Sequence, residues 1–244
     1  MRYFISIILW IILISNSIIL FPIVVAAFFF DKNGTFAHHI MCLWAKGNFY
    51  LGLFKWQIVS EDSLEIESPY VIVCNHSSYF DICTILALMP LQLKFISRKN
   101  FFWVPLWGWS MYLARYIKVD LNNPRRAARE LIKSREWLEK GFSILIFPEG
   151  TRSVDGKIGS FNNGAFRLAL NSGYPILPVT LVGTHYVIPK HTLFIIPSRV
   201  AMVLGKPMET SHLNKKELPG IIENIRNQMV ENYIKYFPGT GPRL

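Results

Sequence analysis

A histidine and an aspartate stand close together at the end of an apolar run, in the segment VIVCNHSSYFDI at residues 71–82. Imidazole takes up protons near neutral pH, and a carboxylate that holds the ring in one orientation helps it act as a general base. These residue types therefore admit a proton-transfer pair, His76 and Asp81. The structural alternative is a surface histidine in a turn, followed by an aspartate that caps a helix.

His76 and Asp81 could not pair if both lay on one helix, because positions i and i+5 lie about 140° apart around the helix axis. They can meet if His76 stays in a loop and a helix begins near Asp81. We expect that arrangement, with the apolar run YVIVCN at 70–75 as the strand that precedes the loop.

A second polar segment, IFPEGTRS at 146–153, also follows an apolar run. Gly150 would let the backbone approach a ligand closely. Glu149 could accept hydrogen bonds from the hydroxyls of a polyol, and Arg152 offers a planar fork that matches phosphate. Taken alone, this segment would be an ordinary turn with an exposed arginine.

Elements that would position both segments are visible after Glu61, where short β-branched runs alternate with helical patterns. Continuous apolar runs are typical of strands that are covered on both faces. We predict an α/β fold with a mixed, mostly parallel central sheet flanked by helices, and chemistry on the loops at the strand ends. The expected strands are 70–75, 94–97, 143–147, 176–182 and 198–204.

Two longer helical patterns accompany these strands. The first covers 123–141, with Asn123 as the cap, Pro124 in the first turn and Gly141 at the stop. The second covers about 219–237 and carries apolar residues, among them Phe237, at helical spacing.

The N-terminal region contains no charged side chain from residue 3 to residue 30. A helix of that length would extend about 42 Å, more than the roughly 30 Å of a bilayer's hydrocarbon core. A cleaved signal sequence is the alternative, but its apolar part is normally only about 7 to 15 residues long. Pro22 and the polar residues at 15–17 interrupt the run.

A turn signal at 31–35 and a second apolar segment at 36–54 follow. We therefore expect a two-helix membrane anchor over 1–58, ahead of a catalytic domain over 59–244. Whether the anchor spans the bilayer or lies in one leaflet stays open.

Composition also indicates a membrane surface. The formal net charge is +10, yet 51% of the residues are hydrophobic and only 17% are charged. A basic and apolar chain is better suited to anionic lipid than to nucleic acid. The three cysteines lack the spacing of a disulfide framework or a zinc site, and we expect no bound metal. Cys74, close to His76, is a conceivable nucleophile, but a buried and unreactive strand cysteine is the favoured interpretation.

Four blocks, in order, resemble the 1-acylglycerol-3-phosphate acyltransferase family, the membrane-bound lysophosphatidic acid acyltransferases. NHSSYFD at 75–81 matches the family's N-H-x-S-x-x-D, and FPEGTRS at 147–153 matches its third block. SRKNFFWVPLWGW at 97–109 and ILPVTLVGT at 176–184 resemble the second and fourth blocks.

This resemblance implies transfer of a fatty acyl group from a thioester to the free hydroxyl of lysophosphatidic acid, giving phosphatidic acid. His76 would be the general base and Asp81 its orienting partner, and Ser77 and Ser78 need not be acylated. Arg152, with Lys99 and Arg98, would hold the phosphate. The full set of residues expected to bind substrate is Arg98, Lys99, Glu149, Gly150, Thr151 and Arg152, with Glu149 and Gly150 at the glycerol portion.

The resemblance also implies partners. No cofactor is expected beyond the co-substrate, which is acyl-CoA or the thioester of an acidic acyl carrier protein. The other expected partners are the lysophospholipid acceptor and anionic membrane lipid, and no nucleic acid. The protein should be associated with an inner or cytoplasmic-facing membrane, with its active site at the membrane surface.

Two departures from the family pattern keep other acceptors open. Asn162 stands in place of the lysine of the family's F-K-x-G, and Leu121 in place of an arginine that often follows the aspartate at 120. Both changes remove a basic group near the expected site, so another lysophospholipid is an alternative acceptor. A serine lipase would need a G-x-S-x-G elbow, which the sequence lacks. A non-catalytic lipid binder would not need the pair of His76 and Asp81.

Overall fold

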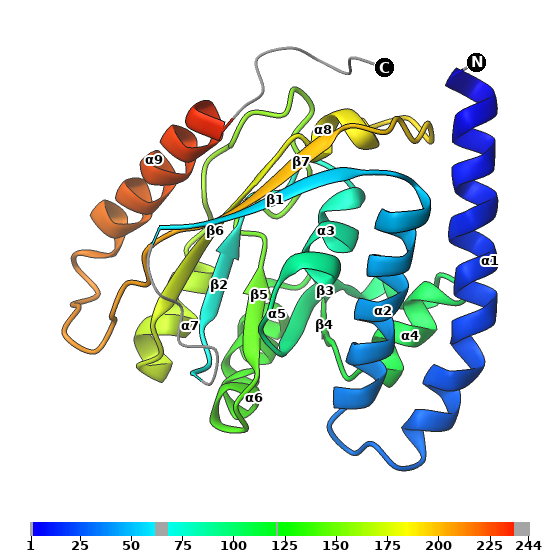
Figure 1. Ribbon diagram of the computed structural model, residues 1–244. Helices are drawn as coiled ribbons and strands as arrows, with labels where there is room; N and C mark the ends of the chain where they lie inside the picture. The colour runs from blue at the N-terminus through cyan, green and yellow to red at the C-terminus, as the bar shows by residue number, and fades with distance from the viewer. Residues whose placement is uncertain (1, 62–67, 121, 237–244) are drawn as a thin grey trace.

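A computed structural model describes residues 2–61, 68–120 and 122–236 (Figure 1). Within these ranges seven strands form one central sheet: β1 (Lys55–Ser60), β2 (Val71–Cys74), β3 (Leu93–Arg98), β4 (Ile117–Val119), β5 (Ser143–Ile146), β6 (Ile176–Val182) and β7 (Arg199–Leu204). Their order is β1-β7-β6-β2-β5-β3-β4, and neighbours run parallel except β6 and β7. The predicted mixed, mostly parallel sheet is confirmed.

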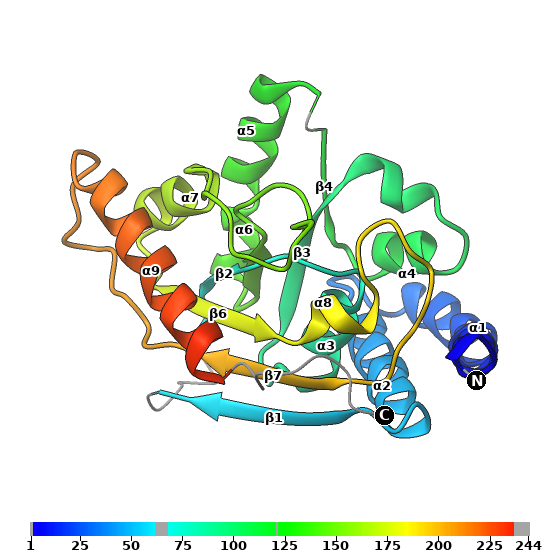
Figure 2. The ribbon, with the colours of Figure 1, turned by 90° about the horizontal axis from the view of Figure 1, so that it is seen from above.

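Helices cover both faces of this sheet (Figure 2). β2, β5 and β6 are buried at every position, which accounts for their continuous apolar sequences. One face packs against α2 (Thr35–Leu51), α3 (Phe80–Leu88), α4 (Trp107–Leu113) and the short 3-10 helix Lys99–Trp103. The other packs against α5 (Pro124–Lys133), α6 (Arg135–Glu139), α7 (Gly164–Ser172) and α9 (Leu218–Tyr236), and α8 (Thr184–Val187) follows β6.

The helix expected over 123–141 is divided at Ser134 into α5 and α6. Its ends are as predicted. The side chain of Asn123 accepts a hydrogen bond from the backbone N–H of Arg126 at 3.1 Å, and Gly141 follows with φ of +84°. The last expected helix is α9, and Phe237 lies outside the described residues.

Helix α1 (Arg2–Phe28) runs through Pro22 without a break. Its segment Tyr3–Phe28 has a mean hydropathy of 2.6 and is the one described helix long and apolar enough, by length and composition, to cross a membrane. The polar positions in its middle serve helix packing. Ser17 Oγ accepts hydrogen bonds from the indole N–H groups of Trp44 and Trp107 at 2.9 and 3.0 Å, which joins α1 to α2 and α4.

Two features of the structure bear on the expected N-terminal anchor. The expected second apolar helix is present as α2, with Ala37, Met41, Ala45 and Phe49 buried in the core that it shares with α3. Among the described helices, α1 is the one long and apolar enough to span a membrane. Strand β1, which contains the expected boundary between residues 58 and 59, pairs with β7 along its whole length. The division into an anchor and a catalytic domain stays a prediction.

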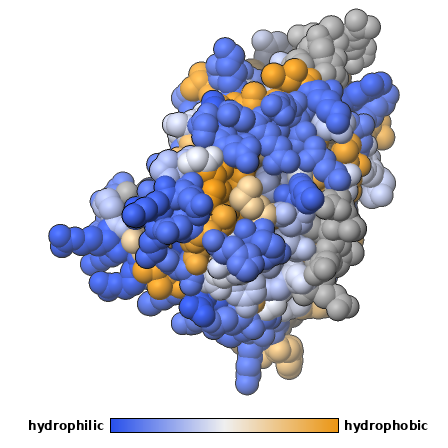
Figure 3. Space-filling model, turned by 90° about the vertical axis from the view of Figure 1, so that its left-hand side faces the viewer, coloured by the Kyte–Doolittle hydropathy of each residue, from blue (hydrophilic) through white to orange (hydrophobic). Residues whose placement is uncertain are grey.

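The two sides of the molecule differ in polarity. Helix α1 lies at one side and leaves isoleucines exposed, including Ile7 at 58% and Ile19 at 68%. The opposite side, which carries α9 and α7, is mostly hydrophilic (Figure 3). Of these two sides, the α1 side is therefore the one suited to contact with lipid chains.

Candidate active site

His76 and Asp81 meet in the arrangement that the sequence predicts. β2 ends at Cys74, His76 lies in the following loop, and α3 begins at Phe80, which places Asp81 in the first helical turn. His76 Nδ1 lies 2.7 Å from Asp81 Oδ2. The contact between the two side chains is confirmed, and their catalytic role stays a prediction.

The carboxylate of Asp81 fixes the tautomer of the histidine. Asp81 is fully buried, and its Oδ2 also accepts hydrogen bonds from the backbone N–H groups of Ser77 and Ser78 at 2.7 and 2.8 Å. These donors and the N-terminus of α3 stabilise a negative charge there. Because Oδ2 acts as an acceptor, the proton of the His76–Asp81 bond belongs to Nδ1, and Nε2 keeps a free lone pair.

The ring of His76 is also held from one face. Phe147, which follows β5, stacks on it with ring centroids 4.1 Å apart and an interplanar angle of 18°. Nε2 has no hydrogen-bond partner in the described part of the chain, and the side chain is 17% exposed. The imidazole is therefore oriented by Asp81 and Phe147 with its basic nitrogen available, as a general base requires.

Backbone contacts fix the loop between the strand ends. Asn75 exchanges two hydrogen bonds with the backbone of Leu181 in β6, at 3.0 and 2.7 Å. On the β5 side, the N–H of His76 donates to Glu149 Oε1 at 2.8 Å, and its carbonyl accepts from the N–H of Ser153 at the same distance. The segment 149–153 is thus bound to the peptide of His76, which joins the first and third blocks into one site.

Glu149 has a bracing role that the sequence did not reveal. Oε1 accepts from His76 and Oε2 accepts from the backbone N–H of Gly159 at 3.0 Å, so both oxygens are engaged within the protein. Burial raises the pKa of this carboxyl, while the two N–H donors oppose the shift. Its predicted contact with the glycerol portion stays a prediction.

Arg152 lies in the same loop and is held by an aromatic ring. Its Cζ lies 3.6 Å from the ring centroid of Tyr79, a residue of the first block that the sequence did not single out. Nη1 is buried and has no hydrogen-bond partner among the described residues. An oriented guanidinium with an unused buried donor is suited to an anionic ligand.

The two basic residues of the second block both have partners within the protein. Arg98 donates from Nη2 to the carbonyl of Gly150 at 2.6 Å, and Gly150 has φ of +71°, which favours glycine. Lys99 Nζ lies 2.7 Å from Asp120 Oδ2. Arg98 thus braces the third-block loop, and much of the charge of Lys99 is neutralised. Thr151 is exposed beside them.

The conceivable protein nucleophiles are poorly placed. Cys74 is fully buried, and burial raises the pKa of its thiol well above the usual value. Ser77 Oγ lies 3.1 Å from Thr184 Oγ1, and Ser78 Oγ donates to the carbonyl of Ile188 at 2.8 Å. In the described ranges no group of three His, Cys, Asp or Glu side chains could hold a metal ion. Direct attack by a substrate hydroxyl fits this site better than a covalent enzyme intermediate.

Substitution of these nucleophiles should therefore have small effects. We expect Ser77→Ala and Cys74→Ala each to lose less than about tenfold in rate, well below the 10² to 10⁴ typical of a removed general base. Initial rates, with a thermal melt of each variant, check this. A variant that melts like the wild type but is inactive would indicate a covalent intermediate.

Comparison with known proteins defines the family of this site. The Acyltransferase family model matches residues 55–182, more than half of the chain, so the chain belongs to the Acyltransferase family. Curated relatives include the chloroplastic 1-acyl-sn-glycerol-3-phosphate acyltransferase BAT2 of Brassica napus, 35% identical over 83% of this chain and 58% of its own length. Another is the 1-acyl-sn-glycerol-3-phosphate acyltransferase of Saccharomyces cerevisiae, 31% identical over 76% of this chain and 62% of its own length.

A solved structure has the same fold over nearly all of this chain. The 1-acyl-sn-glycerophosphate (LPA) acyltransferase PlsC of Thermotoga maritima is similar with a TM-score of 0.77 and 26% identity, over 98% of this chain and 100% of that one. The curated plant relatives are longer proteins. The chain spans 58% of the Brassica napus enzyme and 49% of the chloroplastic LPAT1 of Arabidopsis thaliana.

Proposed function

We propose that the protein transfers a fatty acyl group from an acyl thioester to the free hydroxyl of lysophosphatidic acid, giving phosphatidic acid in phospholipid biosynthesis. The observation that carries the proposal is the 2.7 Å contact between His76 Nδ1 and Asp81 Oδ2, which leaves Nε2 free. Arg152 Nη1, in the adjoining loop, is buried without a hydrogen-bond partner among the described residues, which supports an acceptor with a phosphate. The names of the relatives support the same substrate.

The chemistry follows from the orientation of His76. Nε2 takes the proton of the acceptor hydroxyl while the hydroxyl oxygen bonds to the thioester carbonyl carbon. Asp81 stabilises the imidazolium that forms. When the carbon–sulfur bond breaks, the imidazolium returns the proton to the departing thiolate. No residue of the protein is acylated, and the histidine ends each cycle neutral.

The membrane supplies the acceptor and receives the product. Helix α1 has the length and hydropathy to hold the protein at a bilayer, and its exposed isoleucines would face lipid chains. The net charge of +10 favours anionic lipid and, equally, an acidic donor. We place the site at the surface of an inner or cytoplasmic-facing membrane, with acyl-CoA or the acyl carrier protein thioester as donor.

The proposal is tested with membranes that contain the full chain. Lysophosphatidic acid is supplied with acyl-CoA or with acyl carrier protein thioester, and phosphatidic acid is measured by mass spectrometry against membranes that contain His76→Ala. We expect product above this control with at least one donor. Acylation of a different lysophospholipid without any phosphatidic acid would reassign the acceptor, and no acylation at all would contradict the proposal.

A further inference from the structure

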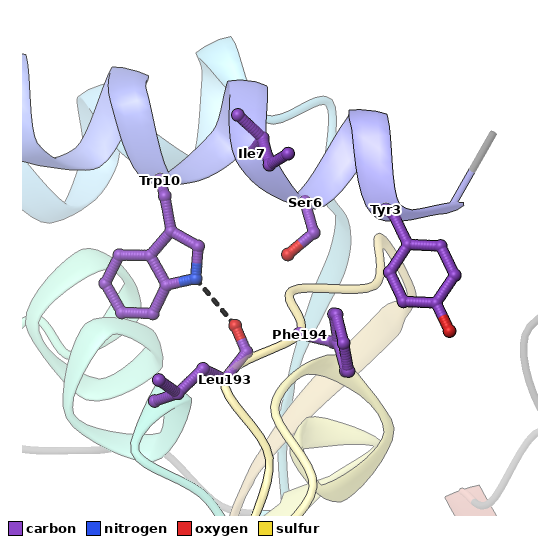
Figure 4. A pocket seen from close by; sticks show the side chains of 6 residues that line it. All are labelled: Tyr3, Ser6, Ile7, Trp10, Leu193 and Phe194. Carbon is purple, nitrogen blue, oxygen red and sulfur yellow. Dashed lines mark hydrogen bonds between the residues drawn. The ribbon is translucent and has the colours of Figure 1, made fainter.

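Residues 188–197, between α8 and β7, form a segment that links α1 to the active-site loop, and we name it the bridging segment. Residues 193–195 of this segment contact α1. The indole N–H of Trp10 donates to the carbonyl of Leu193 at 2.6 Å, as Figure 4 shows, and Ser6 Oγ accepts from the N–H of Ile195 at 2.9 Å. The rings of Tyr3 and Phe194 meet edge to face, 5.0 Å apart. The bridging segment thereby provides hydrogen-bond partners for Trp10 and Ser6, two polar side chains of the otherwise apolar helix α1.

The first residues of the bridging segment contact the loop that carries Arg152 and the loop that carries His76. Lys190 Nζ donates to the backbone carbonyl of Arg152 at 2.5 Å, and the lysine is half-buried. The hydroxyl of Ser78, close to His76 in the chain, donates to the carbonyl of Ile188 at the start of the segment. One segment therefore contacts α1, the first block and the third block.

The ammonium of Lys190 has no acidic partner among the described residues. Neither Lys190 nor Arg152 forms an ion pair with an acidic side chain in the part of the chain that the structure describes, whereas Lys99 is paired with Asp120. An ammonium has three donors, and the carbonyl of Arg152 accounts for one. Glu149, the carboxylate of the same loop, is engaged by the backbone N–H groups of His76 and Gly159, so a bound anion would be a favourable partner for these two cations.

The positions at which the sequence departs from the family pattern leave room for such a cation. Asn162 and Leu121 stand where basic residues are common, and the charge of Lys99 is largely taken up by Asp120. Lys190 lies outside the four blocks, so no motif identifies it. It is nevertheless the lysine whose ammonium contacts the backbone of Arg152.

We propose that Lys190 is a specificity-determining residue for the acceptor's phosphate, acting together with Arg152, and that α1 sets its position through the bridging segment. This inference rests on the proposed function, because it assigns Arg152 to the same phosphate. It adds a charge that compensates for the two missing basic positions, and it gives the contacts of Ser6 and Trp10 a role in acceptor recognition.

Substitutions of Lys190 separate its charge from its packing. Lys190→Met removes the charge and the donor, Lys190→Gln keeps a donor without the charge, and Lys190→Arg keeps both. We expect kcat/KM for lysophosphatidic acid to fall about tenfold in Lys190→Met, which is about 1.4 kcal/mol, mainly through KM. Lys190→Gln should fall nearly as far, and Lys190→Arg should recover most of the loss. Activity toward a monoacylglycerol, which lacks the phosphate, should hardly change.

The contribution of α1 is tested with a matched pair of tryptophan variants. Trp10→Phe keeps the ring and removes the bond to Leu193, and we expect a rise of a few-fold in KM for lysophosphatidic acid, on the order of one lost neutral hydrogen bond. Trp44→Phe removes the bond to Ser17, which joins α1 and α2 away from the bridging segment, and should leave acceptor preference unchanged. Equal effects of the two variants would contradict a specific role for the bridging segment.

A second readout keeps this inference separate from the proposed function. The detergent-solubilised full chain is melted with inorganic phosphate or with chloride at equal ionic strength. We expect phosphate to raise the melting temperature of the wild type and of Lys216→Met, an exposed control, and to raise that of Lys190→Met and Arg152→Ala much less. If wild-type protein forms phosphatidic acid but Lys190→Met keeps both its acceptor preference and its phosphate stabilisation, Lys190 has no such role. Absence of phosphatidic acid with the wild type would instead overturn the proposed function, and the melts would still decide whether Lys190 binds phosphate.

Discussion

His76→Ala is expected to lower the acyl-transfer rate by about 10² to 10⁴ while the protein stays folded. The substitution removes Nε2, the basic nitrogen that Asp81 and Phe147 orient. It leaves the backbone N–H and carbonyl of residue 76, which hold Glu149 and Ser153 in place. Initial rates with lysophosphatidic acid, together with a thermal melt and membrane fractionation, measure the effect.

A second histidine variant provides the control. His39 is exposed on α2, where its ring bonds the carbonyl of Thr35, and His39→Ala should keep wild-type activity. A folded, membrane-bound His76→Ala protein that kept most of its activity would mean that another group takes the hydroxyl proton.

Arg152→Ala is expected to reduce activity toward lysophosphatidic acid by about 10- to 150-fold. A hydrogen bond to a charged group contributes about 1.5 to 3 kcal/mol, and about 1.4 kcal/mol corresponds to a factor of ten. The guanidinium is stacked on Tyr79 and has a buried donor unused among the described residues, so little reorganisation is needed for it to meet a phosphate. The loss should be confined to acceptors with that phosphate.

Comparing lysophosphatidic acid with monoacylglycerol shows whether Arg152 binds the phosphate or only supports the loop. Arg135→Ala, which removes an exposed arginine paired with Glu139 on α6, serves as the control and should change nothing. If Arg152→Ala weakens lysophosphatidic acid and monoacylglycerol equally and also lowers the melting temperature, the arginine only supports the loop. The phosphate would then be bound elsewhere.

The sequence predicted the buried part of the sheet well and its edges poorly. The central strands are covered on both faces, so their apolar runs are long and unmistakable, as in VIVC of β2 and ILPVTLV of β6. β1 is exposed at nearly every position and carries polar residues, and β4 has only three residues. Neither has a pattern that separates it from a loop, since edge strands are recognisable mainly by their pairing partners.

Prediction from sequence is limited in a similar way for α1 and α2. Hydropathy alone predicts two anchor helices, because the apolar residues of α2 look the same whether they face lipid or protein. In the structure Phe49 of α2 stacks on Phe80 of α3 with ring centroids 5.0 Å apart. Tertiary packing, which is not encoded locally, decides which residues of an apolar helix are buried against the protein.

In the site, short-range contacts could be predicted and long-range ones could not. His76 and Asp81 are near neighbours in the sequence, so a loop followed by a helix start was enough to place them together. The contacts of Glu149 with the N–H of His76 and of Lys190 with the carbonyl of Arg152 join residues 73 and 38 positions apart. Side chains that bind distant backbone groups leave no periodicity or spacing by which a sequence reveals them.

The measurement that tests the central claim most directly is a double-mutant cycle on the His76–Asp81 pair. Rates of lysophosphatidic acid acylation are compared for His76→Ala, Asp81→Asn and the double variant, each shown to be folded. Asp81 acts through the ring of His76, so we predict that Asp81→Asn is nearly as damaging as His76→Ala and that the double variant is little worse than either. Losses that multiply in the double variant would show that the two residues act independently, and would contradict the oriented general base.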